Sequence, residues 1–592
     1  MLRPLIRFVV IAALAATRAP AEAKVTAASA VATESAGFGD AAGVVATENP
    51  HAAAVGASVL ASGGSAVDAA IATALAVCVV HPTSCGIGGG GFMVGWDAAT
   101  RRAWALDFRE TAPAAIAPAL FDKDGKYDPA RSRTGGLAVG VPGDVAGLAE
   151  AQHRYGRLAW REVVAPAARL ARTGFVVSPH LAQSIAKNRA SLAADPPLAS
   201  VFLTAAGEPL AAGSRLRRPE LATTLDAIAR SGPSAFYAGE RARAIAAAVQ
   251  AHGGVLTVAD LAAYRPVWRE PLRDTYRGAG VYTMPLPSSG GPTLLLALGV
   301  LSRHDPAAFG PGSPTLFHLT AEILKHGFAH RAATAGDPAF DRLAPLPVPD
   351  ELARRIDSFR TRPARAYGPG DAAAHDAGTA HVSVLAADGS GVALTTTINT
   401  AFGAFIGVPG TGIVLNNQMD DFTFDAPNAF GLAPGRSNRI APRKRPVSSM
   451  TPTLVVEDGR ATVAVGASGG PLIVSATLQA VVGVLDLDAT SASALEAPRI
   501  HHQWQPDILL VEPGVREIDR MALTRLGHAI VEIPGVAAVS LAVARPGRAV
   551  SAAGDPRKGG GAALAQSPAR ESNPSPTHAV PPPAPATVGT RR

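Results

Sequence analysis

The sequence predicts a layered fold of mixed helices and strands, and three observations support this. Hydrophobic residues make up 47% of the 592 residues, which is enough to bury a large core. Short Val-, Thr- and Ile-rich runs bounded by Gly and Pro alternate with Ala- and Leu-rich stretches of helical periodicity. We find no repeat of fixed period. We therefore expect an α/β or α+β chain, built as two domains or one large layered unit.

The helical stretches are expected at residues 66–80, 143–155, 160–173, 241–252, 315–333 and 472–482. The first of them contains Asp68, which is unfavourable in a membrane span. Ser65 in front of it is a good N-cap, and Asp68 lies at the third helical position, where a negative charge favours the helix start. We interpret residues 66–80 as a buried helix of a globular protein.

The first 23 residues predict a signal peptide. Arg3 and Arg7 precede the apolar run 8–16, and Ala21-Glu22-Ala23 offers a small-x-small cleavage site. The apolar run is far shorter than the ~20 residues that a spanning helix needs. We expect residues 1–23 to be removed and the mature protein to be secreted across the inner membrane to the periplasm, with no membrane span.

Charge and cysteine content exclude several classes of protein. Four of the seven net positive charges lie in the first 23 and the last 28 residues, and no Lys/Arg run is interleaved with aromatics, so we expect no nucleic-acid partner. Two cysteines exclude a disulfide framework and any four-Cys metal site. We expect Cys78 and Cys85 to be small buried apolar residues rather than a functional thiol pair.

Two segments are expected to lie outside the core. Residues 354–377 show no apolar period and are interpreted as an exposed loop. Residues 566–592 are rich in Pro, Ala and Ser, with almost nothing to bury, and are interpreted as a disordered tail.

A β-hairpin is predicted directly after the long loop. Two alternating runs flank Asp388-Gly389, a strong turn signal. Folding the chain about this turn places Thr379 opposite the neighbourhood of Thr397 and Asn399, which are two residues apart and share one face. On this pattern alone, an ordinary pair of β-branched strands is the favoured explanation of the threonines, ahead of a functional site.

Nine strings, taken in order along the chain, alter that balance. The strings are CGIGGGGFM (85–93), LDFRETAP (106–113), AVGVPG (138–143), PLPSSGGP (285–292), GTAHVSV (378–384), LNNQMDDF (415–422), KRPVSSMT (444–451), GASGGP (466–471) and APRIHHQW (497–504). With these strings, the sequence resembles the γ-glutamyltransferases (γ-glutamyl transpeptidases), members of the N-terminal-nucleophile hydrolase superfamily, from about residue 43 to residue 563.

The resemblance implies an αββα four-layer sandwich, made as an inactive precursor that cuts itself between Gly378 and Thr379. The large subunit would be residues 24–378, and the small catalytic subunit residues 379–565 followed by the tail. The Thr379 hydroxyl would then be the nucleophile and its freed α-amine the general base. An α-amine has a pKa of about 7.7–8.0, which suits it to accepting and returning a proton at neutral pH.

The resemblance also implies a site for a γ-glutamyl group. Arg109, Ser448 and Ser449 would bind its α-carboxylate, because a guanidinium matches a carboxylate bidentately and hydroxyls add donors. The α-ammonium would be received by Asn399, Gln418 and Asp421. The backbone N–H groups of Gly469 and Gly470 would stabilise the oxyanion, and Thr397 would position Thr379. A surface ion pair of Arg109 with Asp107 or Glu110 is the alternative for that residue.

The activity so implied is that of a γ-glutamyltransferase and glutathione hydrolase, which passes the glutamyl group to water or to an amino-acid or peptide acceptor. No cofactor and no metal are expected. A cephalosporin (glutaryl) acylase-like or poly-γ-glutamate-acting relative is the alternative within the enzymes. An unprocessed binding protein on the same fold is a further alternative.

Three other motifs offer competing interpretations. The glycine-rich run 86–91 matches a dinucleotide fingerprint, but a helix precedes it and a strand follows, the reverse of that motif. Ser468 stands in G-x-S-x-G, which would make a serine hydrolase with His501, His502 or His528. A His501-His502 metal pair lacks a third ligand at a recognisable spacing.

The segment between Asp421 and Lys444 has the length of the loop that covers the glutamyl pocket in bacterial members of the family. Phe430 stands where they commonly carry a tyrosine. The resemblance therefore leaves open how this loop would be held closed.

Overall fold

The computed structural model describes residues 31–367, 378–435 and 437–566. The predicted signal peptide and residues 567–592 of the predicted tail lie outside these residues. So do residues 368–377 of the predicted loop. Gln566, which we assigned to the tail, is instead the last residue of strand β23 (Gly561–Gln566) and pairs with Ala41.

Two seven-stranded sheets form the centre of the molecule, and neighbouring strands within each are antiparallel. The first sheet has the order β1 (Val31–Ser35), β22 (Val550–Gly554), β21 (Ala538–Val543), β17 (Arg460–Ser468), β16 (Thr453–Glu457), β11 (Ala279–Thr283) and β10 (Leu272–Tyr276). The second has the order β23, β2 (Ala41–Thr47), β12 (Gly378–Ala386), β13 (Gly391–Asn399), β3 (Gly90–Asp97), β4 (Arg102–Phe108) and β9 (Val267–Arg269).

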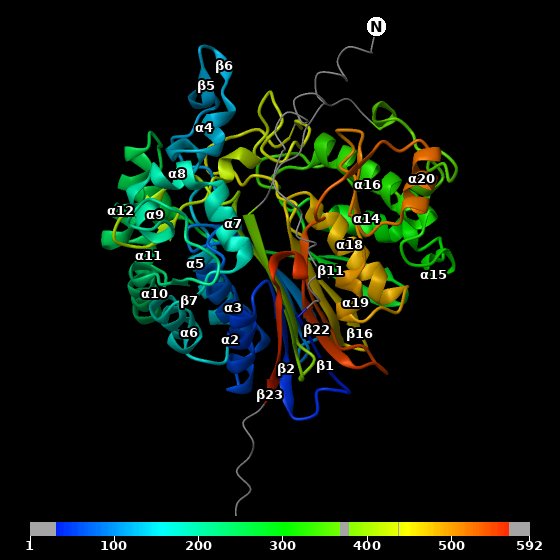
Figure 1. The fold of residues 1–592 in the computed structure, drawn as a ribbon, viewed down its shortest axis with the longest axis horizontal. Helices are drawn as coiled ribbons and strands as arrows, with labels where there is room; N and C mark the ends of the chain where they lie inside the picture. The colour runs from blue at the N-terminus through cyan, green and yellow to red at the C-terminus, as the bar shows by residue number, and fades with distance from the viewer. Residues whose placement is uncertain (1–30, 368–377, 436, 567–592) are drawn as a thin grey trace, which may run out of the picture.

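Helices cover the outer face of each sheet, so the order of layers is helix, sheet, sheet, helix, as the resemblance implied (Figure 1). The helices on the second sheet include α2 (Pro50–Ala61), α3 (Ala66–Val80), α5 (Asp144–Tyr155), α6 (Trp160–Thr173), α10 (Pro219–Ser231) and α12 (Gly239–Ala251). Those on the first sheet include α14 (Gly290–Leu301), α16 (Pro314–Thr334), α18 (Leu472–Leu485) and α19 (Ser491–Glu496). All six predicted helices are therefore present, with ends that shift by at most a few residues.

Shorter elements lie around these layers. The helices are α4 (Pro129–Arg133), α7 (Pro179–Lys187), α8 (Arg189–Ala193), α9 (Pro196–Phe202), α11 (Ser234–Tyr237), α13 (Val258–Ala263), α15 (Pro306–Phe309), α17 (Pro349–Ala353) and α20 (Glu517–Arg525). The strands are β5 (Asp122–Lys123), β6 (Lys126–Tyr127), β7 (Phe175–Val176), β8 (Arg215–Leu216), β14 (Gly407–Val408), β15 (Ile413–Val414), β18 (Ile500–His501), β19 (Leu509–Val511) and β20 (Ile530–Glu532).

Side-chain alternation along the strands explains why two cores form. Val45 of β2 packs in the core beneath the α2–α12 helices, while its neighbours Val44 and Ala46 pack in the core shared with the first sheet. Because both faces of the second sheet are covered, every residue of β12 and β13 is buried. The strands that carry the predicted nucleophile therefore lie in the interior of the sandwich.

Helix α3 begins as predicted. Ser65 Oγ accepts the backbone N–H of Asp68, and the Asp68 carboxylate accepts the backbone N–H of Ser65, which makes a reciprocal capping box. All fifteen residues of α3 are buried. Among the described residues, no helix combines the length and the apolar character that crossing a bilayer requires.

Two expectations need correction. Cys78 and Cys85 are buried as expected but are joined by a disulfide, which closes the turn between α3 and β3. The described part of the predicted loop is exposed at Phe359, but it is anchored further on. The Trp504 indole N–H donates to the Ala364 carbonyl at 2.8 Å, and the Ala364 N–H donates to Asp507 at 2.7 Å.

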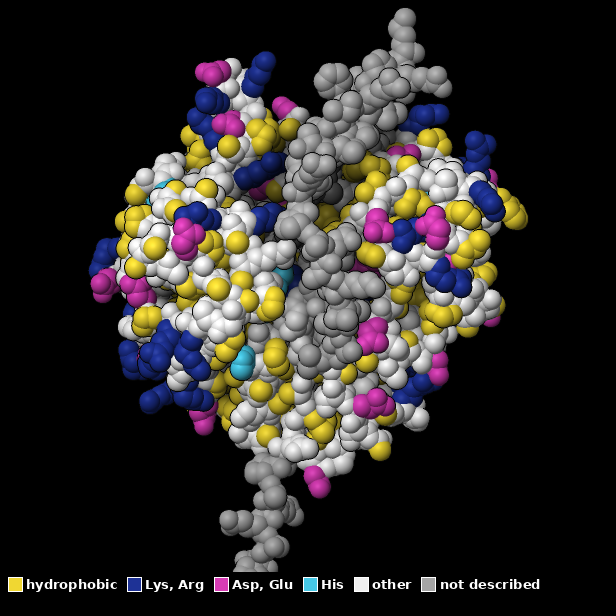
Figure 2. Space-filling model, in the orientation of Figure 1, with side chains coloured by type: hydrophobic (Ala, Val, Ile, Leu, Met, Phe, Trp, Pro, Cys, Tyr) yellow, Lys and Arg dark blue, Asp and Glu magenta, His cyan; other side chains and the backbone are white. Residues whose placement is uncertain are grey.

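Acidic and basic side chains are mixed over the face shown in Figure 2. Basic side chains gather at one edge of this face, in the region of α6 and α10, where Arg172 pairs with Asp226.

Candidate active site

The residues that the motifs predicted meet at one buried cavity at the start of β12. Its volume is about 20 Å³, which is room for roughly one water molecule. A glutamyl group can therefore enter only if the walls move apart. The predicted residues that line it are Arg109, Thr379, Thr397, Asn399, Gln418, Asp421, Ser448, Ser449 and Gly470. Gly378 and Gly469 are the two predicted site residues that are not part of the lining.

The predicted hairpin brings Thr379 to its partner. Thr379 pairs with Thr397 in the β12–β13 ladder, and a bulge between Gly378 and Thr379 sets Gly378 opposite Asn399. A Cβ atom at Gly378 would lie 2.6 Å from the Thr83 carbonyl oxygen and 2.7 Å from that of Thr400. Glycine is therefore required immediately before Thr379, because no side chain fits there.

A chain of hydrogen bonds joins the Thr379 hydroxyl to the Gly378 carbonyl. Thr397 Oγ donates to the Gly378 oxygen at 2.6 Å and accepts the Asn399 N–H at 2.8 Å. The Thr379 and Thr397 hydroxyl oxygens are 3.2 Å apart. Because the single Thr397 proton is committed to Gly378, the Thr379 hydroxyl is the donor between the two threonines. The hydroxyl thus lies beside the carbonyl that it would attack, and Thr397 polarises that carbonyl.

The two glycines of GASGGP connect β17 to α18. Gly469 has φ +140° and Gly470 has φ +59°, backbone angles that residues with a side chain rarely adopt. In addition, a Cβ atom at Gly469 would lie 2.9 Å from Ala537. Their carbonyls accept the N–H groups of Leu472 and Ile473. Within the described residues neither glycine N–H has an acceptor. These donors lie beside the positive end of α18 and are available to an oxyanion.

Arg109 and Asp421 form a buried ion pair with each other, an arrangement that the motifs did not predict. Arg109 also lies 3.6 Å from Glu110, and its Nε donates to the Pro446 carbonyl at 3.2 Å. Burial raises the pKa of Glu110 to about 8, so at neutral pH this carboxyl is mostly uncharged and Asp421 is the main counter-charge. A surface ion pair is wrong for Arg109, because Arg109 is fully buried.

The amides around Asp421 complete one end of the cavity. Gln418 Nε2 donates to Asp421 Oδ2 at 2.7 Å, and Gln418 Oε1 is buried without a donor among the described residues. Asn399 Nδ2 donates to the Asn417 carbonyl at 2.9 Å. A cationic group placed here would find the Asp421 carboxylate and an unused amide oxygen together.

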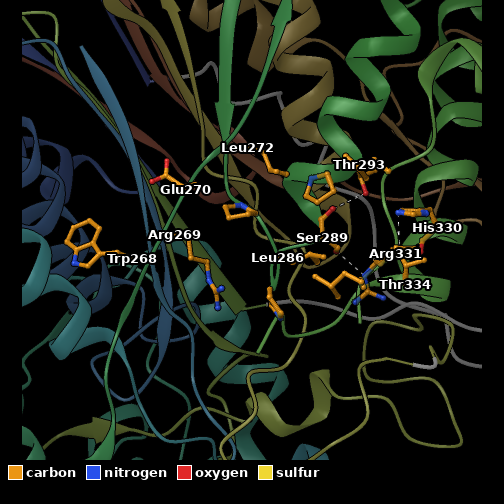
Figure 3. A pocket seen from close by; sticks show the side chains of 17 residues that line it. Trp268, Arg269, Glu270, Leu272, Leu286, Ser289, Thr293, His330, Arg331 and Thr334 are labelled. Atoms are coloured by element: carbon orange, nitrogen blue, oxygen red, sulfur yellow. Dashed lines mark hydrogen bonds between the residues drawn. The ribbon is translucent and has the colours of Figure 1, made fainter. Parts of the chain in front are cut away.

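Arg331 also lines the cavity, and no motif pointed to it. It comes from the last turn of α16, and its Nε donates to Ser289 Oγ at 3.1 Å. Figure 3 shows Arg331 beside Ser289 in a second, neighbouring cavity of about 430 Å³. Burial lowers the pKa of Arg331 to about 10, so it stays a cation at neutral pH. Arg331 therefore forms part of the wall between the two cavities.

Phe430 lies in the cavity wall with 4% of its surface exposed. Gln503 Nε2 donates to the carbonyls of Phe430 and Gly431 at 3.2 and 3.1 Å. The loop that carries Phe430 is thus held over the cavity through its backbone, without a side-chain hydroxyl at this position.

The serine-hydrolase interpretation is not supported by the geometry. Ser468 Oγ accepts a hydrogen bond from Lys558 Nζ at 2.9 Å, whereas His501 Nδ1 contacts Ser475 at 2.6 Å. His528 contacts His318. No described histidine is hydrogen-bonded to Ser468.

The His501-His502 pair and the glycine-rich run have structural contacts in place of the metal and dinucleotide roles that compete for them. His501 and His502 bind different partners, Ser475 and Asp507 respectively. One group of possible metal ligands exists among the described residues, His318, Glu322 and His528, but Lys325 Nζ lies 3.0 Å from Glu322 and supplies its positive charge. The 86–91 glycines pack on β13, where a Cβ at Gly89 would lie 2.0 Å from the Thr397 carbonyl oxygen.

Comparison with known proteins gives a consistent set of similarities. The family model described as Gamma-glutamyltranspeptidase matches residues 52–565. The chain is 39% identical over 524 residues to the "Glutathione hydrolase proenzyme" of Escherichia coli (strain K12), covering 87% of this chain and 90% of that protein. It is 39% identical over 519 residues to the "Acylase ACY 1 proenzyme" of Pseudomonas sp. (strain V22), covering 85% and 89%. The crystal structure of cephalosporin acylase from Bacillus halodurans superposes with TM-score 0.80 at 27% identity, covering 92% and 99%.

Proposed function

The chain belongs to the gamma-glutamyltranspeptidase family, and from that premise we propose that it is a self-cleaving γ-glutamyltransferase and glutathione hydrolase with Thr379 as its nucleophile. The observation that carries the proposal is the hydrogen-bond chain from the Thr379 hydroxyl through Thr397 to the Gly378 carbonyl. This chain lies at the edge of a cavity whose Arg109–Asp421 pair offers a cation and an anion to a zwitterion.

Self-cleavage begins from the continuous chain. Thr379 Oγ attacks the Gly378 carbonyl carbon, and the Gly378–Thr379 C–N bond breaks as the nitrogen takes up a proton. This leaves Gly378 as an ester on Thr379 Oγ. Water hydrolyses the ester, which yields a Gly378 carboxylate and a Thr379 with both hydroxyl and α-amine free. Thr397, already hydrogen-bonded to the Gly378 oxygen, stabilises the charge that develops on it.

The mature site then repeats the same chemistry on a donor such as glutathione. The α-amine takes the proton of Thr379 Oγ as this oxygen attacks the γ-carbonyl, the N–H groups of Gly469 and Gly470 bind the oxyanion, and the leaving amine takes the proton. Water or an amino-acid or peptide acceptor then resolves the γ-glutamyl ester.

Donor binding would replace the ion pair between Arg109 and Asp421 by two ion pairs between these residues and the donor. In the structure the two side chains pair with each other. A glutamyl α-carboxylate and α-ammonium can enter between them, so that Arg109 with Ser448 and Ser449 binds the anion, and Asp421 with Gln418 and Asn399 binds the cation. The net charge of the pocket does not change, which keeps the desolvation cost of the swap low. A donor that lacks either charge leaves one buried partner uncompensated.

A γ-glutamyl donor assay tests this function. Purified protein should release p-nitroaniline from γ-glutamyl-p-nitroanilide at least about tenfold faster than from glutaryl-p-nitroanilide, because the second lacks the α-ammonium. A dipeptide acceptor should increase the rate. Preference for the glutaryl compound would support the acylase alternative, which the relatives named as acylases favour.

Arg109→Lys is expected to separate donor binding from maturation. Lysine keeps the positive charge but cannot bind a carboxylate through two parallel N–H groups, as the planar guanidinium does. The KM for the donor should therefore rise by about tenfold or more. Self-cleavage requires no glutamyl group and should proceed. Kinetics and a denaturing gel on the same preparation check both halves. An uncleaved Lys variant would instead assign Arg109 to folding.

Arg331→Met is expected to weaken donors that carry an α-carboxylate. We place the α-carboxylate within reach of Arg331 as well as Arg109, because Arg331 is the cation of the cavity wall that lies outside the Arg109–Asp421 pair. The KM for γ-glutamyl-p-nitroanilide should rise roughly tenfold. The 4-aminobutyryl analogue, which keeps the ammonium but not the carboxylate, should be nearly unaffected. Similar losses on both substrates would show that Arg331 supports the fold of the wall.

We also propose the subunits and the location. The large subunit would be residues 24–378 and the small one residues 379–592. Strands β12 and β13 of the small subunit lie between β2 and β3 of the large one, so the two would remain one sandwich after cleavage. The signal-like N-terminus supports export to the periplasm, where a disulfide between Cys78 and Cys85 is stable.

A further inference from the structure

Lys558 contacts the nucleophilic residue, although no motif pointed to it. It ends the short turn of helix at Pro556–Lys558, between β22 and β23, near the end of the described chain. Its Nζ donates to the Thr379 carbonyl oxygen at 3.1 Å and to Ser468 Oγ at 2.9 Å. Ser84 Oγ lies 3.5 Å away. The ammonium is thus directed at the peptide group between Thr379 and Ala380 in strand β12.

The counter-charge of Lys558 is Glu48. This residue directly follows β2, is fully buried, and places a carboxylate oxygen 3.6 Å from Lys558 Nζ. Burial raises the pKa of Glu48, while the Lys558 cation acts in the opposite direction. The Ser468 hydroxyl and the His381 backbone N–H are further polar groups near the Glu48 carboxyl, and they too lower its pKa. Among the described residues Lys558 is the cation within ion-pair distance of Glu48, and neither residue lines the donor cavity.

The other titratable groups near Lys558 and Thr379 are His81 and His381, together with Arg109, Asp421 and Arg331, which line the cavity with Thr379. Burial lowers the pKa of each histidine to about 3, so both are neutral at working pH. Lys558, paired with Glu48, is therefore the cation that contacts the backbone of Thr379 directly. A residue's own nitrogen lies only about 3 Å from its carbonyl oxygen, so the ammonium lies within roughly 6 Å of the Thr379 nitrogen.

We propose that Lys558 is a positioning residue that fixes the carbonyl of Thr379 and keeps the α-amine released by self-cleavage in its neutral, proton-accepting form, with Glu48 as the counter-charge that limits this effect. The inference rests on the proposed function, because it assigns a task to the amine that maturation creates. A cation at this range disfavours a second ammonium, and such a charge typically moves a pKa by about 1–3 units.

The pH profile of kcat/KM tests the proposal. The midpoint of its acidic limb, the range in which activity rises with pH, reports the pKa of the general base of the free enzyme. Lys558→Met should move the limb to higher pH by about one unit, because the amine is then more readily protonated. Lys558→Arg, which keeps the cation, should leave the limb nearly unchanged. Glu48→Gln should move the limb to lower pH, because the Lys558 charge is then less compensated.

Arg557→Gln is the matched control. Arg557 is the neighbour of Lys558 in the same turn and pairs with Glu512 and Asp555 rather than with Thr379. Its loss should lower the midpoint of thermal unfolding without moving the limb. A purely structural role for Lys558 predicts the same pattern for Lys558→Met as for Arg557→Gln, and that result would overturn the proposal.

Maturation is checked on the same preparations by sequencing the small subunit. A Lys558→Met protein that is cleaved before Thr379 and turns over, but has an unshifted limb, overturns this inference and leaves the proposed function intact. If Lys558→Met is not cleaved, Glu48→Gln carries the test, and an unmoved or raised limb in that variant overturns the proposal. An active Thr379→Ala protein would overturn the proposed function itself.

Discussion

Thr379→Ala is expected to give a single uncleaved chain of roughly 58 kDa once the signal is removed, with no measurable γ-glutamyl transfer. The substitution removes the hydroxyl that attacks the Gly378 carbonyl and, because the chain stays intact, the α-amine is never released. One change therefore abolishes nucleophile and base together. A denaturing gel and a p-nitroanilide assay on the purified variant give the result.

Thr379→Ser is the matched control for this experiment. Serine keeps a hydroxyl beside Thr397 and a nitrogen that can become an amine, so slow cleavage and residual activity are expected. An alanine variant that is cleaved and active would place the nucleophile elsewhere, and Ser468 would be the next residue to test.

Asp421→Asn should reduce kcat/KM for γ-glutamyl donors. The loss should correspond to about 2–5 kcal/mol of transition-state stabilisation. The carboxylate would otherwise pair with the donor ammonium, and asparagine leaves that ammonium buried beside neutral amides. A glutaryl donor has the same chain without the ammonium and should lose much less. It could even gain, because wild-type Asp421 faces it with no cation from the substrate. Both p-nitroanilides assayed on both proteins supply the comparison.

The neighbouring Asp420→Asn variant controls for loop damage. Asp420 accepts hydrogen bonds from Ser132 and from the Ala429 N–H, and so holds the same loop without lining the cavity. Its loss should affect the two donors equally. Equal losses from Asp421→Asn would show that Asp421 also only supports the loop, and would strengthen the acylase alternative.

Much of the fold and of the site follows from local patterns. The turn signal Asp388-Gly389 determines the register of β12 and β13, and the register alone brings Thr379 opposite Thr397. The capping pair Ser65 and Asp68 marks the start of α3 to the residue. The glycines before α18 are recognisable because residues with a side chain rarely adopt positive φ angles, above all the +140° of Gly469.

What could not be predicted depends on contacts between segments distant in the sequence. Arg109 and Asp421 pair with each other across 312 residues, and neither motif carries a sign of the other. Lys558 reaches Thr379 only because β23 returns beside β2 in the same sheet. The Cys78–Cys85 pairing depends on how the turn after α3 folds back, which spacing alone does not determine.

The most direct test of the central claim is the N-terminal sequence of the smaller band from purified wild-type protein. The account predicts two bands of roughly 36 and 22 kDa, from the share of residues on each side of the cut, and a smaller chain that begins Thr379-Ala380-His381 with a free α-amine. A single intact chain that nevertheless turns over γ-glutamyl donors, or a small chain that begins at any other residue, would contradict it.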